Sequence, residues 1–226
     1  MSNVGVNIVQ KRKIIKEVAE IVRKRQTGEG SGHDWWHTYR VWQMAKQINS
    51  KEKADFFVVE LGALLHDIAD WKFHKKDINA GVKVAQQILT PKGVPLEIME
   101  QVGDIITTVS FKGAGVKTPM KTLAGKIIQD ADRLDALGAI GIARAFAYGG
   151  HKNRPIYSPG AKTIMHQSFK HYQKTQSGNT INHFYEKLLL LKDRMNTKTG
   201  KKMAQQRHKF METYLKRFYK EWEGTI

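Results

Sequence analysis

An apolar run that ends in a histidine and an aspartate is the feature that most constrains how this chain folds. Residues 54–69 are apolar almost all round, which predicts a central helix buried among other elements. Near its end the run places His66 and Asp67 side by side. Burying an imidazole beside a carboxylate costs on the order of several kcal/mol unless other groups pair with them. Taken alone, the dipeptide favours an inert pair bonded to backbone at a helix end, and the alternative is a divalent metal bound between helices.

The rest of the chain shows the apolar spacing of helices and little strand-like alternation. The predicted helices cover residues 8–26, about 34–50, 54–69, 76–89, 95–109, 122–137, 139–148, 163–174, 181–195 and 200–222. We therefore predict an all-α protein with one domain over 1–226, in which core motifs occupy about 10–150 and C-terminal helices over 160–223 pack on them. A polar loop with proline and glycine at 149–160 is the main irregular feature.

Composition limits the kinds of site and partner that the chain can have. It contains no cysteine, so neither a disulfide framework nor a thiolate metal site is available. No apolar run approaches the ~20 residues of a membrane span, and no secretory signal is present, so we expect a cytoplasmic protein with no membrane association. The 38 Lys and Arg against 21 Asp and Glu give a net charge of +17, which favours an anionic ligand. Because this charge is spread along the chain without a nucleic-acid-binding signature, we expect a phosphorylated small molecule and not nucleic acid.

Metal-binding side chains occupy inward positions on three of the predicted helices. Apolar residues follow His37 at offsets of 4, 7 and 11, so this histidine points toward the core. Asp132 takes an inward position in the apolar helix 122–137. With His66 and Asp67 they form a nitrogen and oxygen set that suits Mn²⁺, Fe²⁺, Co²⁺, Ni²⁺, Zn²⁺ or Mg²⁺. Two imidazoles argue against a pure Mg²⁺ or Ca²⁺ site, and four protein ligands leave two positions of an octahedral ion for water and a phosphate oxygen.

Three short motifs carry these residues: His37 with Arg40 and Val41, the pair His66-Asp67, and Ala131-Asp132-Arg133-Leu134. The pattern resembles that of the HD-domain metal-dependent phosphohydrolases. Four flanking segments are similar to the bacterial YpgQ/YedJ-like subfamily: residues 32–37, 129–136, 143–150 and 183–189. The likeness extends from about residue 10 to residue 223.

The resemblance implies a helical HD fold that binds one divalent metal through His37, His66, Asp67 and Asp132. Members of this subfamily are associated with hydrolysis of nucleoside triphosphates to a monophosphate and pyrophosphate, often best with Mn²⁺. HD variants with two or three metals need further histidines between the HD pair and the final aspartate, where this chain has only His74. We therefore expect one metal per chain, Mn²⁺ first and Mg²⁺, Ni²⁺, Co²⁺, Fe²⁺ or Zn²⁺ as alternatives, and a (deoxy)nucleoside triphosphate as substrate.

Asp70 is the candidate general base, with Asp67 as the other catalytic carboxylate. On a continuing helix Asp70 lies one turn after His66 and on the same face, where it can accept a proton from the attacking water or orient that water. In the related stringent-response hydrolases an acidic residue occupies this relative position. The alternative for Asp70 is a surface carboxylate.

A polyphosphate needs cations besides the metal. The candidate substrate contacts are His33, His74, Lys75, Arg144, Tyr148, His151, Lys152 and Arg154. The loop 149–160 that carries the last three is a candidate lid, and Tyr148 either stacks on a base or packs. A solvated surface role is the alternative for each cation.

Residues next to the predicted ligands have their own alternatives. Asp34 is expected to cap the helix of His37. Asp135 can lie beside the site because it follows Asp132 by three residues. Arg40 and Arg133 either pair with carboxylates or contact substrate.

Other functions are compatible with the same residues. A phosphomonoesterase or a cyclic-nucleotide phosphodiesterase would use the same metal site. Hydrolysis of stringent-response nucleotides comes third, because the Glu-Asp pair typical of those enzymes is Ala69-Asp70 here. The non-enzymatic alternative is a basic nucleic-acid-binding helical protein with a structural metal. The sequence leaves open the base and sugar preference, the physiological metal, the product and the oligomeric state, a homodimer included.

Overall fold

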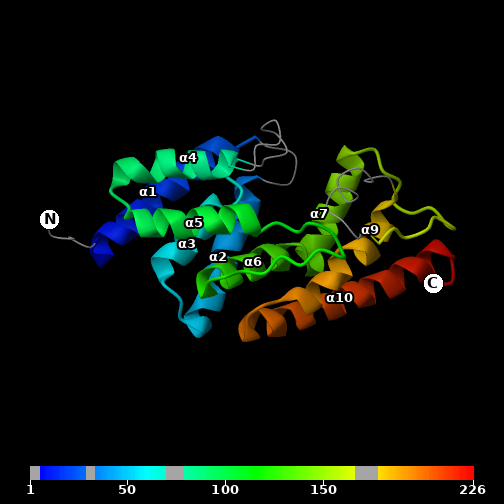
Figure 1. Ribbon diagram of the computed structural model, residues 1–226. Helices are drawn as coiled ribbons and strands as arrows, with labels where there is room; N and C mark the ends of the chain where they lie inside the picture. Colours follow the sequence, from blue (N-terminus) through cyan, green and yellow to red (C-terminus); the bar gives the residue numbers. More distant parts are fainter. Residues whose placement is uncertain (1–5, 29–33, 70–78, 166–177) are drawn as a thin grey trace. The chain divides into compact units, whose positions relative to one another are not determined.

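The computed structural model describes residues 6–28, 34–69, 79–165 and 178–226, and every regular element in these ranges is helical (Figure 1). The all-α prediction is confirmed. The chain divides into two compact units. The first comprises Met1–Ser110 and Thr118–Ala131, and the second comprises Phe111–Lys117 and Asp132–Ile226.

Several predictions fall outside the described residues. These are the roles of His33, Asp70, His74 and Lys75, and most of the predicted helix 163–174. The part of that helix within the description, residues 163–165, is not helical. Within the described ranges no helix is both long enough and apolar enough to cross a membrane.

The first unit is a set of helices that surrounds one short apolar helix. Its elements are α1 (Ile8–Gln26), α2 (Trp35–Glu52), α3 (Phe56–Leu65), α4 (Ala80–Leu89), the 3₁₀ helix η1 (Thr90–Lys92), α5 (Leu96–Thr108) and the beginning of α6 (Leu123–Asp135). Helix α3 packs against α1, α2 and α5 (Figure 1). Its side chains at Phe57, Leu61, Leu64 and Leu65 are fully buried. The predicted central helix is therefore confirmed.

Glycine at position 62 allows this close packing. A Cβ at Gly62 would lie 2.6 Å from Cδ1 of Ile128 and 3.3 Å from Cδ1 of Ile105. Those distances are below van der Waals contact, so a side chain here would require the buried side chains of Ile128 and Ile105 to move.

Helix α3 ends earlier than the sequence predicts. It stops at Leu65, and residues 66–69 form a turn in which the amide of Ile68 donates to the carbonyl of Leu65 at 3.1 Å. The predicted helical relation between His66 and Asp70 required the helix to continue through residue 69. It no longer follows, and Asp70 itself lies outside the described residues.

Helix α2 begins and faces the core as predicted. The Oδ1 atom of Asp34 accepts a hydrogen bond from the amide of His37 at 2.8 Å, so Asp34 is the N-cap. His37, Val41, Met44 and Ile48 are all buried. The cap and the core-facing spacing together fix the start and the rotation of the helix that carries His37.

Removal of this cap is expected to destabilise the protein by about 1 kcal/mol. Asp34→Ala leaves an N-terminal amide of α2 without its acceptor, and chemical denaturation measures the loss. Asp104→Ala is the control, because the side chain of Asp104 forms an exposed ion pair with Lys121 at 3.3 Å, which contributes little to stability. Equal unfolding midpoints for the two variants would contradict the assigned capping role.

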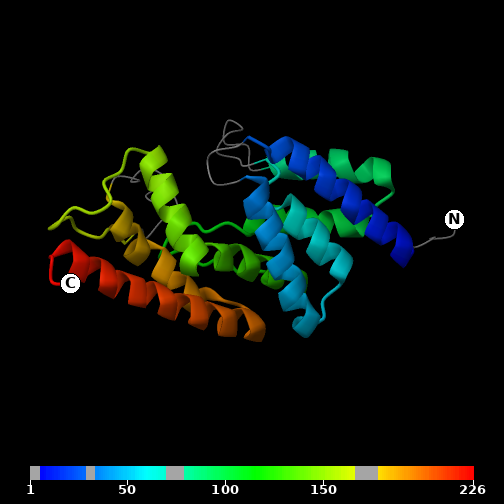
Figure 2. The same cartoon turned by 180° about the vertical axis from the view of Figure 1, so that it is seen from behind.

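The second unit contains the end of α6 and the C-terminal helices. They are α7 (Gly138–His151), α9 (Thr180–Glu186), the 3₁₀ helix η2 (Leu188–Arg194) and α10 (Lys198–Trp222). Helix α10 packs against α7 and η2 (Figure 2).

Two helices of this unit differ in extent from the prediction. Helix α7 continues to His151, so residues 149–151 of the predicted loop are helical. Gly149 has a packing role in this extension, since a Cβ there would collide with Oγ1 of Thr180. The predicted helix 181–195 is interrupted at Lys187, where φ is −140° and ψ is −59°.

The large apolar side chains of α10 are only partly buried. Met211 and Leu215 are buried, whereas Phe210 is 52% exposed and Trp222 is 46% exposed. The ring of Tyr157 packs edge-on against Trp222, with 5.0 Å between centroids. The last turn of α10 thus belongs to an aromatic cluster near the surface of this unit and not to its core.

Candidate metal centre

Two buried imidazoles meet where α2 packs against the end of α3. The Nε2 atoms of His37 and His66 lie 3.2 Å apart. The exposed fractions of these residues are 1% and 4%. Two basic nitrogens this close repel each other if both present lone pairs, and the repulsion is removed by a proton or a metal ion between them.

The hydrogen bond made by Nδ1 of His66 shows which of the two ring nitrogens carries the proton. Nδ1 of His66 lies 2.8 Å from the carbonyl oxygen of Ala63, which only accepts hydrogen bonds. Nδ1 therefore carries the hydrogen, and neutral His66 presents the lone pair of Nε2 toward His37. Metal-binding histidines characteristically donate their second ring N–H to a carbonyl in this way. The carbonyl of Ala63 is also among the last four of α3, so His66 satisfies an end group of the helix that carries it.

Asp67 supplies an oxygen to the same point. Its Oδ2 lies 3.4 Å from Nε2 of His37 and 3.6 Å from Nε2 of His66, and its side chain is 12% exposed. Atoms bound about 2.1 Å from one ion are about 3.0 Å apart at a right angle and about 3.4 Å apart at a tetrahedral angle. The three atoms thus have the separations of ligands around a single ion, and the donor set fits a divalent metal.

Asp132 joins this group through α6. The helix is continuous across the boundary between the units, and Asp132 directly follows Ala131 of the first unit. His37, His66 and Asp132 each offer one ligand atom, and these atoms lie within 4.8 Å of one another. The group can hold a metal ion.

The preceding turn of α6 is anchored in the first unit by a buried glutamine. Nε2 of Gln129 donates to the carbonyls of Val109 at 3.3 Å and Thr118 at 3.0 Å. These two carbonyls flank the segment Phe111–Lys117. The anchor fixes α6 one turn before Asp132.

The charged residues after Asp132 have protein partners. Nη1 of Arg144 lies 2.5 Å from Oδ2 of Asp135, whose side chain is 1% exposed. Arg133 donates to the carbonyl of Arg194. Arg144 was predicted to contact substrate, and the structure places it in this ion pair.

The other described candidate contacts gather around one aromatic ring of the second unit. Nζ of Lys152 lies 5.7 Å from the ring centroid of Tyr148, and Cζ of Arg154 lies 5.4 Å from it. Tyr148 and Arg154 are half-buried, whereas His151 and Lys152 are exposed at the end of α7. The structure thus brings Tyr148, Lys152 and Arg154 together.

Two residues near these groups were missed by the sequence reasoning. Gln26 donates from Nε2 to the carbonyl of Asp67 at 3.4 Å. Its signal was its spacing, because it follows the buried Ile14, Val18 and Val22 at intervals of four residues. A polar residue in a core-facing series is the same signal that identified His37.

Arg194 was the second omission, and no local pattern marks it. It donates to three carbonyls of the segment Phe111–Lys117 and lies 4.9 Å from the ring centroid of Phe111. Burial lowers the pKa of Arg194 below its ordinary value. Arg194 fastens this segment within the second unit.

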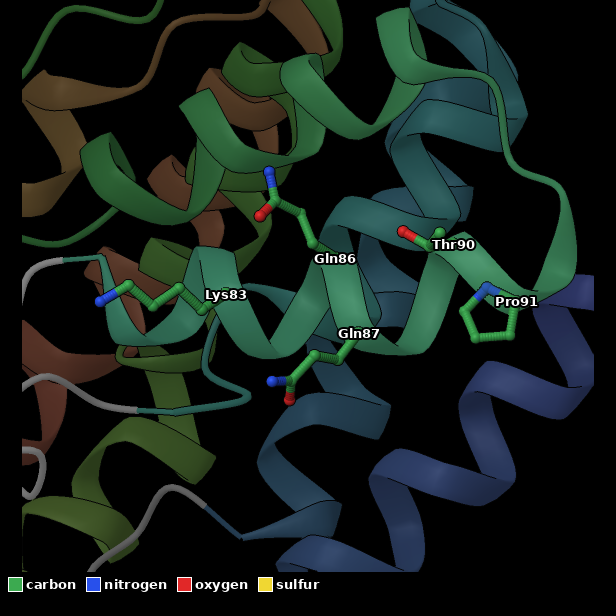
Figure 3. A pocket seen from close by; sticks show the side chains of 5 residues that line it. All are labelled: Lys83, Gln86, Gln87, Thr90 and Pro91. Atoms are coloured by element: carbon green, nitrogen blue, oxygen red, sulfur yellow. The ribbon is translucent and has the colours of Figure 1, made fainter.

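A depression on the outside of α4 is unrelated to these groups. It is lined by the exposed residues Lys83, Gln86, Gln87, Thr90 and Pro91 (Figure 3). It contains neither a carboxylate nor an imidazole, so it lacks the ligand types of a metal site.

The described elements are all helical, and His37, His66 and Asp132 form a cluster that could hold a metal ion. Residues 35–137, from the start of α2 to just beyond α6, match the HD domain. The chain is also 39% identical to YpgQ of Bacillus subtilis strain 168 over 217 residues, which cover 94% of this chain and 97% of YpgQ. The chain belongs to the HD-domain family.

Solved structures agree with this assignment. A protein from Lactobacillus plantarum superposes with a TM-score of 0.83 at 32% identity, covering 97% of this chain and all of its own. An HD-superfamily hydrolase from Bacillus thuringiensis gives 0.73 at 39% identity, with 94% and 98% covered. B. subtilis YpgQ in complex with ADP gives 0.71 at 37% identity, with 92% and 97% covered. The chain is therefore an HD-superfamily hydrolase.

Proposed function

We propose that this protein is a metal-dependent nucleotide pyrophosphohydrolase that converts (deoxy)nucleoside triphosphates to a monophosphate and pyrophosphate. His37, His66, Asp67 and Asp132 hold one divalent metal, Mn²⁺ by preference. The convergence of two imidazole nitrogens and a carboxylate oxygen within 3.6 Å carries the proposal. Support for a nucleotide substrate comes from the ADP complex of YpgQ and from the net charge of +17.

The residues of the site have different roles: some would bind the metal, and Asp70 would accept a proton. A divalent ion held here supplies Lewis acidity toward a phosphoryl oxygen and toward water. His66 is held in the tautomer that leaves Nε2 free to bind, since its Nδ1–H is donated to Ala63. In the reaction, water attacks the α-phosphorus, the bond to the bridging oxygen breaks, and pyrophosphate leaves. We assign the water's proton to the carboxylate of Asp70.

The proposed substrate contacts are His33, His74, Lys75, Tyr148, His151, Lys152 and Arg154. Lys152 and Arg154 flank Tyr148, which places two cations beside a flat aromatic surface. This combination suits a ligand with phosphates and a base. Arg144 acts through Asp135, with which it pairs.

The match to the HD domain ends at residue 137, beyond the point in α6 where the two units divide. This supports the proposal that one HD domain, with core motifs in residues 10–150, includes parts of both units.

A product-resolved nucleotide panel tests the reaction. The protein is incubated with nucleoside triphosphates, nucleoside monophosphates and cyclic nucleotides in the presence of Mn²⁺, Mg²⁺, Co²⁺ or Ni²⁺, and with EDTA as a control. We expect one pyrophosphate per triphosphate consumed, fastest with Mn²⁺ and absent with EDTA. Orthophosphate as the sole phosphate product would contradict the proposal and indicate a phosphomonoesterase. Turnover confined to cyclic nucleotides would indicate a phosphodiesterase.

A further inference from the structure

A buried glutamine reaches the main chain of a candidate metal ligand. Gln26 is the last residue of α1 and is 6% exposed. Its Nε2 lies 3.4 Å from the carbonyl oxygen of Asp67, which is 41 residues away in the sequence. The contact therefore links the end of α1 to the turn that follows α3.

Side chains add to the hydrogen bonds of that turn, which lies beyond the end of α3. Nδ1 of His66 donates to the carbonyl of Ala63, the amide of Ile68 donates to Leu65, and Gln26 donates to Asp67. The first two bonds lie within three residues along the chain. Gln26 lies on another helix, so its bond ties the turn to the end of α1.

An apolar side chain would suit the packing at position 26 better than an amide. Ile14, Val18 and Val22 precede it on the same face, and all are buried. Burying a carboxamide is unfavourable unless it is hydrogen-bonded. Among the described residues its Oε1 accepts no hydrogen bond. The amide thus adds little to stability, and its contribution is the bond to Asp67.

We propose that Gln26 is a positioning residue for the metal site. By holding the carbonyl of Asp67, it orients the carboxylate of that residue toward Nε2 of His37 and of His66. The inference rests on the proposed metal site. If the carboxylate of Asp67 turns away from the two imidazoles, the protein binds the metal less tightly and the coordination geometry of the metal changes. Loss of a hydrogen bond that supports a ligand typically lowers metal affinity about 10–100-fold.

The test uses Gln26→Met, which keeps the length of the side chain and removes the donor. Isothermal titration calorimetry with Mn²⁺ measures affinity, and the visible absorption of the Co²⁺-loaded protein reports coordination geometry. We expect the Kd for Mn²⁺ to rise about tenfold and the Co²⁺ bands to shift. Gln86→Met is the matched control, because Gln86 projects from the exposed face of α4 (Figure 3). It should match the wild type in both measurements.

A purely structural role gives a different result. In that case Gln26→Met lowers the unfolding temperature of the metal-free protein but leaves the Co²⁺ spectrum unchanged and the Kd within twofold of wild type. That outcome overturns the proposal. Gln26→Leu, which extends the apolar series of α1, is measured in the same way if the methionine variant does not fold. If the wild type binds neither Mn²⁺ nor Co²⁺, the metal site and this inference both fail, whereas normal wild-type binding with an unaffected variant overturns the inference alone.

Discussion

His66→Ala is expected to lower the affinity for Mn²⁺ by at least about 100-fold, a larger loss than removal of a group outside the coordination shell produces. The substitution removes one of three ligand atoms that lie within 3.6 Å of one another. It also leaves the carbonyl of Ala63 without the donor Nδ1. Hydrolysis of nucleoside triphosphates should fall with metal occupancy. Isothermal titration calorimetry and pyrophosphate release measure the two losses separately.

A buried histidine outside the proposed metal site provides the control for this variant. His208 of α10 is 9% exposed and lies 3.4 Å from Glu212, so His208→Ala also removes a buried imidazole but leaves His37 and His66 intact. It should retain metal binding and turnover. Full metal binding by His66→Ala would exclude His66 as a ligand. Nucleic-acid binding that survives His66→Ala and falls steeply with salt would instead favour the basic nucleic-acid-binding alternative.

The helical pattern could be predicted because it depends on local spacing. The apolar series of α1 and α2 fixed which faces are buried, and the position of Asp34 before α2 identified its cap. His37 followed from the same spacing, because a residue in a core-facing series points where its neighbours point. These inferences need no knowledge of other elements.

Element ends were predicted less well because they depend on distant contacts. Helix α3 gives way to a turn at His66, and Gln26 of α1, 41 residues away in the sequence, donates to the carbonyl of Asp67 in that turn. Gly149 resembles a helix terminator in the sequence, yet it remains helical where α7 lies against Thr180. Local patterns cannot reveal which distant element supplies the deciding contact.

The ion-pair partners of charged residues also could not be predicted from local sequence patterns. Arg144 was a candidate substrate contact because a polyphosphate needs cations besides the metal. The structure pairs it with Asp135, on the preceding helix. The pairing follows from how α6 and α7 pack, which the sequence pattern does not specify.

That pair is expected to carry a large share of the stability of the second unit. The carboxylate of Asp135 is 1% exposed and lies 2.5 Å from Nη1 of Arg144, which is 27% exposed. Arg207 donates to the adjacent carbonyl of Leu134 at 2.6 Å. Burial lowers the pKa of Arg207, and the charge of Asp135 opposes that shift. One carboxylate therefore compensates two guanidinium groups.

Asp135→Asn removes this charge and keeps the shape of the side chain. Breaking one member of a buried ion pair costs about 3–5 kcal/mol because the remaining charge is left uncompensated, and we expect a loss of that size in the free energy of unfolding. Glu221→Gln is the control, since Glu221 and Arg217 form an exposed pair that should contribute no more than about 1 kcal/mol. Similar losses in the two variants would contradict the structural role of Asp135.

Arg144→Met then separates the two roles of the arginine. A structural partner of Asp135 should lose stability when it is replaced, and the double variant with Asp135→Asn should lose less than the sum of the single variants, because each single change already breaks the pair. A direct substrate contact should instead raise KM with little change in unfolding. Because Arg144 lies 2.5 Å from a nearly inaccessible carboxylate, the first pattern is the expected one. Any effect of Arg144 on turnover then passes through the packing of α6 and α7.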